Sequence, residues 1–339
     1  MSKKNLSANL KNGFKNFEDL SNIFINFKNK LDRLNRKNYT VAVSGGPDSL
    51  ALVALTKAYS YKKKTKFNYV LIDNNIRKNS AVEAQKVKEL LNKNKINLNV
   101  ILNKIKIKKN IQGLARVVRY EILSKYCKKN NISTLLTAHN LEDQVETFFI
   151  RLSRGSGLKG LSSMSFETKI GNKISLYRPL LNIKKKFLVK ISKNIFGTYF
   201  KDPSNKNFKY LRTKVRNLKK PLRKSGIEYE QIIKSINNLA SSKATLDNYL
   251  KNIFKNIIKK KGKEVLLDFR KFKKHDLEIQ IALINESIRR LKNNYYDLRS
   301  KKVENLIKNF KKKNFKKSTL GGCIFVIKNE NLCLKIEKT

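Results

Sequence analysis

The chain has 339 residues, of which 40% are hydrophobic, so it is long enough for two domains with packed cores. Its formal net charge of +52, from 77 Lys and Arg against 25 Asp and Glu, favours a polyanionic partner, and nucleic acid first. A codon bias toward Lys, Asn and Ile can supply part of that charge, but it does not require so few acids.

Cysteine usage and hydropathy narrow the class of protein further. Cys127, Cys323 and Cys333 stand far apart in the sequence, which argues against a zinc or iron–sulfur site and is typical of reduced thiols. The N-terminus lacks an apolar segment of signal-peptide length, and no apolar run approaches the roughly 20 residues of a membrane span. We therefore expect a cytoplasmic protein that does not contact a membrane.

From residue 38 onward the chain alternates between strand and helix patterns. Residues 1–37 predict a polar tail followed by a helix with apolar residues at helical spacing. The next expected strands are 39–43, 67–73, 98–105 and 133–140, and the expected helices are 49–59, 80–94, 111–130 and one from about 141. This order predicts an α/β fold with a doubly wound parallel sheet, which binds ligands at the carboxyl ends of its strands.

The pattern changes after about residue 215. Residues 216–310 predict mostly helix, and lysine runs such as 256–263 predict solvated helix faces, some of them facing RNA. The alternating segment 319–338 predicts a β-hairpin that turns at 328–331. We therefore expect three parts: a tail and helix (1–37), an α/β catalytic domain (38–215) and a basic helical domain with a terminal hairpin (216–339).

Residues 44–49, with the sequence SGGPDS, join the first strand to the first helix of the expected sheet. The glycine pair lets the backbone approach a ligand, and the amides of the helix start favour an anion. Asp48 would repel a phosphate there unless a cation such as Mg²⁺ lies between them. Neither the lysine-containing phosphate loop nor the dinucleotide fingerprint fits this spacing, and an ordinary Gly-Gly turn is the structural alternative.

A second cluster of polar residues follows the fourth expected strand. Asn140 is a suitable N-cap for the helix from 141, and Val145, Phe148, Phe149 and Leu152 predict one buried stripe on it. Asp143 and Glu146 lie three residues apart, so they are neighbours on another face of this helix. They could serve a site or simply complement the helix dipole.

These motifs together resemble a known family. SGGPDS resembles the pyrophosphate loop of the PP-loop ATP-pyrophosphatases, whose fold is adenine nucleotide alpha hydrolase-like. An ordered set of motifs across nearly the whole chain resembles the tRNA(Ile)-lysidine synthetases: SGGPDS, IDNNIR at 72–77, ARVVRY at 115–120, AHNLEDQVET from 138, RPLL at 178–181, DPSN at 202–205, LRTKVRNLKKPL at 211–222 and TLGGC at 319–323.

The resemblance implies a ligase that forms a carbon–nitrogen bond. Enzymes of this family use ATP to adenylate C2 of the wobble cytidine, position 34, in a tRNA(Ile) with a CAU anticodon. The ε-amine of the co-substrate L-lysine then attacks C2, which gives lysidine, AMP and pyrophosphate and switches decoding and aminoacylation from Met to Ile. The family resemblance thus implies ATP, Mg²⁺, lysine and tRNA(Ile) as ligands, and it leaves open whether the chain forms a homodimer.

The resemblance also assigns roles by matching position. The residues implied to bind nucleotide are Ser44, Gly45, Gly46, Pro47, Asp48, Ser49, Asp73 and His139, with Asp48 as the Mg²⁺ ligand. The residues implied to take part in the reaction are Asp48, Arg119, Asp143 and Glu146. Among these, Asp143 and Glu146 would bind the lysine ammonium, and Arg212 and Arg216 would hold phosphate or tRNA near the site.

The chain also departs from the family pattern, at 74–75, 139–140, 142–143 and 212–213. These changes affect secondary contacts more than the reaction, because Asp48, Arg119, Asp143 and Glu146 are retained. Two alternatives stay open: a PP-loop tRNA thiolase, which commonly needs paired cysteines, and a non-catalytic basic RNA-binding protein.

Overall fold

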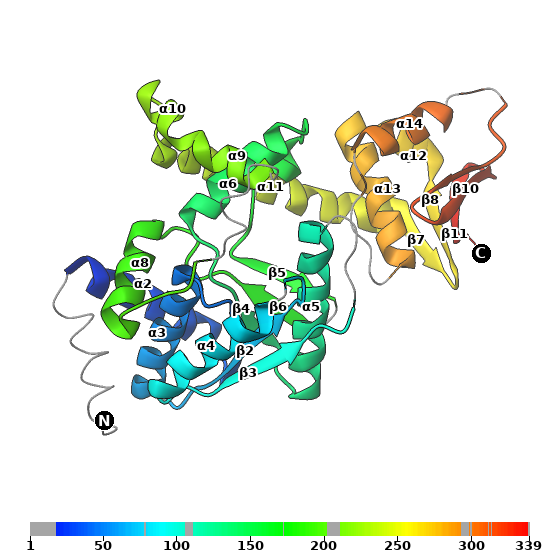
Figure 1. Cartoon of the computed structure of the whole chain (residues 1–339). Coiled ribbons are helices and arrows are strands. Elements are labelled where there is room, and N and C mark those ends of the chain that lie inside the picture. Colours follow the sequence, from blue (N-terminus) through cyan, green and yellow to red (C-terminus); the bar gives the residue numbers. More distant parts are fainter. Residues whose placement is uncertain are drawn as a thin grey trace. The chain divides into compact units, whose positions relative to one another are not determined.

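The computed structural model describes residues 18–77, 79–105, 111–171, 173–201, 211–292, 298, 300–310, 312 and 314–337. The chain forms two compact units, Met1–Ala240 and Ser241–Thr339, which are considered separately (Figure 1). The boundary expected at residue 215 separates a catalytic domain from a basic helical domain, and this division stays a prediction. In the described part of the chain, no helix is long and apolar enough to cross a membrane.

The first unit contains a six-stranded sheet in the order β3-β2-β1-β4-β6-β5. Its strands are β1 (Asn38–Val43), β2 (Lys66–Asp73), β3 (Leu98–Leu102), β4 (Thr134–Leu136), β5 (Glu167–Ile170) and β6 (Ile174–Tyr177). All neighbours pair in parallel except β5, which is antiparallel to β6. The chain runs from β1 to β2 and β3 on one side and later returns to β4 on the other. The expected doubly wound parallel sheet is therefore confirmed, with its switch point between β1 and β4.

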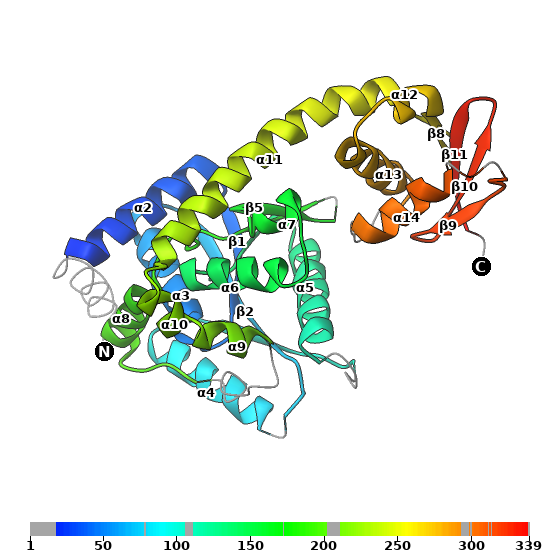
Figure 2. The ribbon, with the colours of Figure 1, turned by 90° about the horizontal axis from the view of Figure 1, so that it is seen from above.

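Helices cover both faces of this sheet (Figures 1 and 2). They are α2 (Glu18–Leu34), α3 (Pro47–Lys62), α4 (Ser80–Lys93) and α8 (Lys185–Phe196) on one face and α5 (Ile111–Lys129) on the other. Side chains alternate between these faces along β2. Tyr69 and Leu71 pack in the core that contains α3 and α8, whereas Val70 and Ile72 pack against Leu123 of α5.

Further helices in the first unit follow β4 and β6. They are α6 (Leu141–Leu152), α7 (Leu158–Leu161), α9 (Leu211–Asn217), α10 (Lys219–Lys224) and the first part of α11 (Tyr229–Ile257), a helix that continues into the second unit after Ala240. Leu141 and Val145 of α6 pack with Tyr229 and Ile232 of α11 in a small core of their own. The stripe expected on α6 is wrong at its end, because Leu152 is 47% exposed there. Its helical spacing was correct, but the neighbouring helices do not cover the last turn.

The second unit is a five-stranded antiparallel sheet, in the order β7-β8-β11-β10-β9, packed with helices. Its elements are β7 (Ile258–Lys261), β8 (Glu264–Asp268), α12 (Phe269–Lys273), α13 (Leu277–Leu291), α14 (Ser300–Phe310), β9 (Ser318–Leu320), β10 (Cys323–Lys328) and β11 (Asn331–Ile336). The expected terminal hairpin is confirmed. Its turn residues Asn329 and Glu330 both have positive φ, which is the backbone of a tight two-residue hairpin turn.

One expectation for this unit is wrong. The lysine run at 256–263 is not a solvated helix face, since Ile258–Lys261 form strand β7 and Gly262 turns the chain into β8 with φ +57°. The deciding signal lies after the run, where Val265 and Leu267 alternate and are fully buried in the core.

Candidate active site

The loop Ser44–Ser49 lies at the carboxyl end of β1, beside the switch point of the sheet. Gly45 has φ +77°, and a Cβ added there would overlap Cγ2 of Val87 on α4. The carbonyl of Gly45 accepts a hydrogen bond from Phe200 N at 3.0 Å. The loop therefore needs glycine at this position, and contacts with distant parts of the unit hold it in shape.

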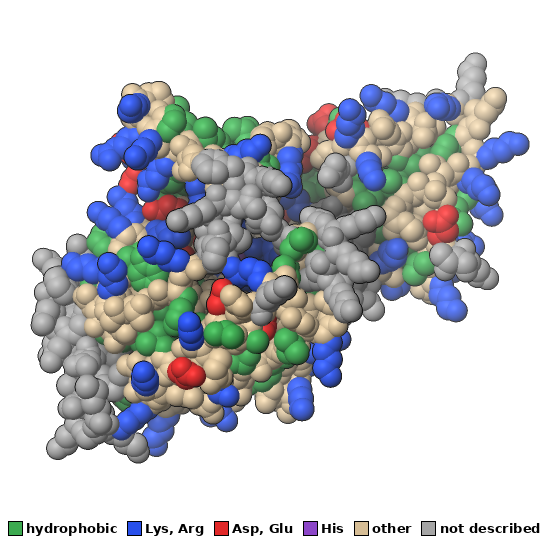
Figure 3. All heavy atoms as spheres, in the orientation of Figure 1, with side chains coloured by type: hydrophobic (Ala, Val, Ile, Leu, Met, Phe, Trp, Pro, Cys, Tyr) green, Lys and Arg blue, Asp and Glu red, His purple; other side chains and the backbone are tan. Residues whose placement is uncertain are grey.

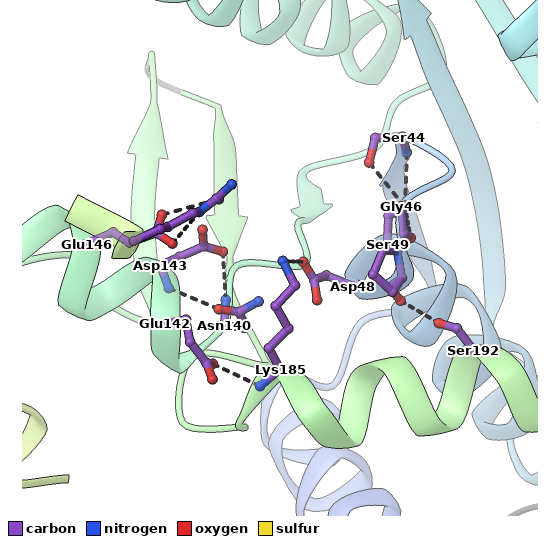
Figure 4. Close-up of polar contacts among 12 residues, drawn as sticks. Ser44, Gly46, Asp48, Ser49, Asn140, Glu142, Asp143, Glu146, Lys185 and Ser192 are labelled. Atoms are coloured by element: carbon purple, nitrogen blue, oxygen red, sulfur yellow. Dashed lines mark hydrogen bonds and ion pairs between the residues drawn. The ribbon is translucent and has the colours of Figure 1, made fainter. Parts of the chain in front are cut away.

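Hydrogen bonds join the two serines of this loop at the start of α3 (Figure 4). No side chain caps the helix, whose N-cap is Gly46 and whose first residue is Pro47. The hydroxyl of Ser49 accepts from Ser44 N at 3.2 Å and donates to Gly46 O at 3.0 Å. An uncapped helix start with hydroxyls beside it is a site for an anion such as phosphate.

Asp48 points from the first turn of α3 toward the start of α8 (Figure 4). Its Oδ2 lies 3.7 Å from Lys185 Nζ, and its Oδ1 is buried without a hydrogen-bond partner among the described residues. Burial raises the pKa of Asp48 to about 6; Lys185 and a hydrogen bond with the Asn140 side chain oppose this shift, and Asp143 and Glu142 add to it. A carboxylate left under-satisfied in this way fits a bound cation.

The donor set also bears on which cation would fit. In the described part of the chain, no three His, Cys, Asp or Glu side chains come together as a metal-binding cluster. A single carboxylate beside a phosphate site is the usual protein contribution to a Mg²⁺ ion that completes its shell with phosphates and water. Asp48 therefore fits Mg²⁺ bound together with a nucleotide.

Asp143 and Glu146 lie on α6, which begins next to the loop. Asn140 and Asp143 form a capping box, with Asp143 N donating to Asn140 Oδ1 at 2.9 Å and Asn140 N donating to Asp143 Oδ2 at 3.1 Å. Glu146 is only 3% exposed. Arg216 Nε donates to Glu146 Oε1 at 2.6 Å, and Arg212 Nε forms an ion pair with Oε2 at 2.8 Å.

The same cluster reaches Asp143, because Arg212 Nη2 lies 3.8 Å from Asp143 Oδ1. Burial raises the pKa of Glu146, although its hydrogen bond from Arg216 opposes that shift. We call Asp143, Glu146, Arg212 and Arg216 the acid–arginine cluster. The structure thus joins two carboxylates and two arginines that are about 70 residues apart in the sequence, and in this state they neutralise one another.

His139 lies after β4, where basic side chains gather. Its Nδ1 is 3.0 Å from Thr137 Oγ1. Burial lowers the pKa of His139 well below its usual value. Nearby arginines lower it further, namely Arg116, Arg178, Arg119 and Arg212. Burial also lowers the pKa of Arg119. A neutral histidine among guanidinium groups suits an anionic ligand.

Asp73 lies at the end of β2, one strand away from the loop, and is buried. Its Oδ1 accepts a hydrogen bond from Asn75 N at 2.9 Å, so the carboxylate stabilises the turn that leaves the strand. The motif at 202–205 lies outside the described residues. The other sequence-predicted residues belong to the loop, the acid–arginine cluster or the basic group around His139, and their individual roles stay predictions.

Three charged residues of this region received no role from the sequence. Lys185 belongs to a run of lysines, in which nothing distinguishes it from its neighbours. Arg178 is buried and donates to Ser165 O at 2.8 Å. Arg116 could have been found, because it precedes Arg119 by three residues and so lies on the same helix face; both guanidinium groups stack on Tyr120.

A cavity of about 510 Å³ opens beside Glu142. Each acid in its wall pairs with a cation: Glu142 with Lys219, Glu228 with Arg223 and Glu230 with Lys184. Glu142 Oε2 also accepts a hydrogen bond from Lys185 N at 2.8 Å. Glu142 thus connects the starts of α6 and α8, which fits a structural role.

One cysteine belongs to the unit that holds this site, and two belong to the other unit. Cys127 is buried behind the sheet and donates to Thr40 Oγ1 at 3.3 Å. Cys323 and Cys333 belong to the second unit, and all three thiols are free. No pair of cysteines therefore accompanies the loop.

Comparison with known proteins agrees with this geometry. The family model described as "PP-loop domain" matches residues 19–222. A U34-tRNA thiolase from Methanococcus maripaludis has a similar structure, with a TM-score of 0.55 and 18% identity, over 65% of this chain and 79% of that one. That likeness concerns the fold alone.

Curated relatives are more similar in sequence. The tRNA(Ile)-lysidine synthase of Orientia tsutsugamushi is 40% identical over 207 residues, which are 59% of this chain and 46% of that protein. The synthase of Rickettsia akari is 33% identical over 319 residues, 91% of this chain and 71% of that protein. The chain spans about half the length of the first relatives it matches. The match to the PP-loop model and to these relatives shows that the chain belongs to the PP-loop family and, within it, to the tRNA(Ile)-lysidine synthases.

Proposed function

We propose that the chain joins L-lysine to C2 of the wobble cytidine in a tRNA(Ile) with a CAU anticodon, using ATP. The observation that carries this proposal is the position of the acid–arginine cluster beside the phosphate loop, at one end of one sheet. A site with a nucleotide half and a carboxylate half suits a reaction that first activates a carbonyl oxygen and then accepts an amine.

In the first step, the C2 oxygen of cytidine attacks the α-phosphorus of ATP, and the bond to the β-phosphate oxygen breaks to release pyrophosphate. The amides at the start of α3 and the hydroxyls of Ser44 and Ser49 would bind the phosphates. Asp48 would hold Mg²⁺, which offsets charge on the leaving pyrophosphate. The buried, partnerless Oδ1 of Asp48 supports this assignment.

The basic group around His139 would face the nucleotide and the RNA. The positive charges of Arg116 and Arg119 lie near His139. Together with burial, they lower the pKa of His139 well below its usual value. His139 is therefore neutral near pH 7 and can donate or accept a hydrogen bond, but it lacks the second ring proton that an imidazolium would deliver as an acid. We assign this group to the α-phosphate of the adenylate and to the backbone of the wobble nucleotide.

In the second step, the ε-amine of lysine attacks C2, the bond from C2 to the adenylate oxygen breaks, and AMP leaves while the amine loses a proton. Asp143 and Glu146 would bind the amine. The raised pKa of Glu146 makes it a better proton acceptor than an exposed carboxylate. Because Arg212 and Arg216 occupy both carboxylates here, tRNA phosphates would have to draw the arginines away first.

Surface charge supports binding of RNA to the first unit. Figure 3 shows Lys and Arg side chains across the face in view. Helices α9 and α10 carry an exposed group of them: Lys214, Lys219, Lys220, Arg223 and Lys224. Such a group binds phosphates and makes affinity fall as salt is added. A tRNA substrate also implies the cytoplasm as the compartment.

Of the two alternatives, a thiolase is disfavoured because the first unit has a single cysteine, Cys127, which is buried and donates to Thr40. A non-catalytic RNA-binding protein would not need to keep an under-satisfied buried carboxylate at the phosphate loop.

Incorporation of labelled lysine tests the proposal. We expect the full chain, with ATP and Mg²⁺, to label unmodified tRNA(Ile) bearing CAU and to release AMP and pyrophosphate. The elongator methionine tRNA, which has the same anticodon, is the matched control and should stay unlabelled. Equal labelling of both tRNAs, or no labelling of either, would contradict the proposal.

A further inference from the structure

Lys185 is the first residue of α8, and its ammonium lies at the phosphate loop (Figure 4). Two contacts hold its backbone there. Lys185 N donates to Glu142 Oε2 at 2.8 Å, and Ser192 Oγ, two turns along α8, donates to Pro47 O in the loop. The fold therefore brings this side chain to Asp48 from a fixed backbone.

The contact between Lys185 and Asp48 is weak for an ion pair. Nζ lies 3.7 Å from Oδ2, beyond hydrogen-bond distance, and the side chain of Lys185 is 41% exposed. A pair with one exposed partner and no hydrogen bond contributes little to stability. Lys185 can therefore exchange Asp48 for another anion at little cost in free energy.

The neighbouring lysines have other partners. Lys184 pairs with Glu230, and the ammonium of Lys186 lies 4.9 Å from the ring centre of Phe187. Of the lysines at 184–186, Lys185 is the one that faces the loop.

We propose that Lys185 binds the pyrophosphate half of ATP, moving from Asp48 to a β- or γ-phosphate oxygen when Mg²⁺ binds Asp48. The inference rests on the proposed function. Mg²⁺ and an ammonium on one carboxylate repel each other, and a triphosphate beside the loop offers more negative charge than Asp48 does. Lysine suits this role, because its flexible side chain carries a compact charge with three donors.

Calorimetry on the full chain tests this inference without using catalysis. In the presence of Mg²⁺, Lys185→Met should weaken ATP binding by about 10- to 100-fold, the worth of a hydrogen bond to a charged group. Affinity for AMP should not change, because AMP lacks the pyrophosphate. Lys185→Arg should keep part of the ATP affinity. Lys186→Met removes the same charge one residue away and should bind ATP like the wild type.

The comparison of ATP with AMP separates a contact from a folding defect. An equal loss of affinity for both nucleotides would overturn the inference, because it would mean that Lys185 shapes the loop. Unchanged ATP affinity in Lys185→Met would overturn it as well. A wild-type chain that binds ATP but does not incorporate lysine would overturn the proposed function while leaving the phosphate contact supported.

Discussion

The two halves of the site differ in how their charges are satisfied. In the nucleotide half, one oxygen of Asp48 lacks a partner among the described residues, and the other lies 3.7 Å from Lys185. In the acid–arginine cluster, Glu146 pairs with both arginines. Its Oε1 lies 2.6 Å from Arg216 Nε, and its Oε2 lies 2.8 Å from Arg212 Nε. Under the proposed function, the first half would take a cation and phosphates directly, whereas the carboxylates of the second half would have to exchange their arginines before binding an amine.

The largest effect on stability is expected at Asp48. The pKa of Asp48 is about 6 in the folded state and 3.8 in the unfolded state. Between pH 3.8 and 6 the folded state therefore binds a proton that the unfolded state has lost, and the free energy of unfolding falls as pH rises through this range. Asp48→Asn removes this penalty, so with EDTA present it should exceed the wild type by about 3 kcal/mol at pH 8 and by much less near pH 4.5. Urea unfolding across this pH range measures the difference.

Asp32→Asn is a control of opposite sign. The hydrogen bonds from Lys28 and Tyr59 lower the pKa of Asp32, so its carboxylate stabilises the fold above the unfolded pKa and that contribution is lost as pH falls. This variant should therefore be less stable than the wild type at pH 8. A gain in Asp48→Asn that stays constant with pH would contradict the under-satisfied state of the nucleotide half.

The glycine of the phosphate loop gives the next effect. Gly45→Ala places a Cβ against Val87 in a backbone with φ +77°, and should cost about 2–3 kcal/mol through strain and overpacking. Gly171→Ala is the matched control, because it has φ +58° but its Cβ would meet no described atom within 4 Å. It should cost about 1 kcal/mol. Equal losses in urea unfolding would mean that the contact with Val87 does not shape the loop.

The smallest effect compares the two halves directly through double-mutant cycles. Glu146→Gln with Arg216→Met should give a coupling energy of about 2 kcal/mol, as for a buried hydrogen bond between charges. Asp48→Asn with Lys185→Met should give less than about 1 kcal/mol, as for a partly exposed pair whose charged atoms lie beyond hydrogen-bond distance. Similar coupling energies in the two cycles would contradict the view that the charges of the two halves are satisfied differently.

Local patterns predicted the parts of the molecule that depend on local physics. The loop at 44–49 could be recognised because its glycines and helix start act over six residues, and strand β2 could be recognised because the part of it that is buried on both faces is a continuous apolar run. The terminal hairpin was predicted for the same reason, since its turn residues lie between two alternating runs.

The remaining features depend on packing between distant segments. The pairing of Glu146 with Arg216 spans 70 residues, and no local pattern indicates it. Lys185 differs from Lys184 and Lys186 only in the direction that α8 gives it. Strand β7 was missed because it has only four residues and follows helix α11 directly. So short a segment does not show whether the helix continues or a strand begins.

The most direct test of the two-half site measures pyrophosphate release and lysine incorporation in one sample with tRNA(Ile). Glu146→Gln should still release pyrophosphate in a single turnover but should incorporate lysine about 100-fold more slowly, because only the amine step uses that carboxylate. Asp48→Asn should lose both by a similar factor. If Glu146→Gln stopped both steps, or if Asp48→Asn spared pyrophosphate release, the division of the site into a nucleotide half and an amine half would be contradicted.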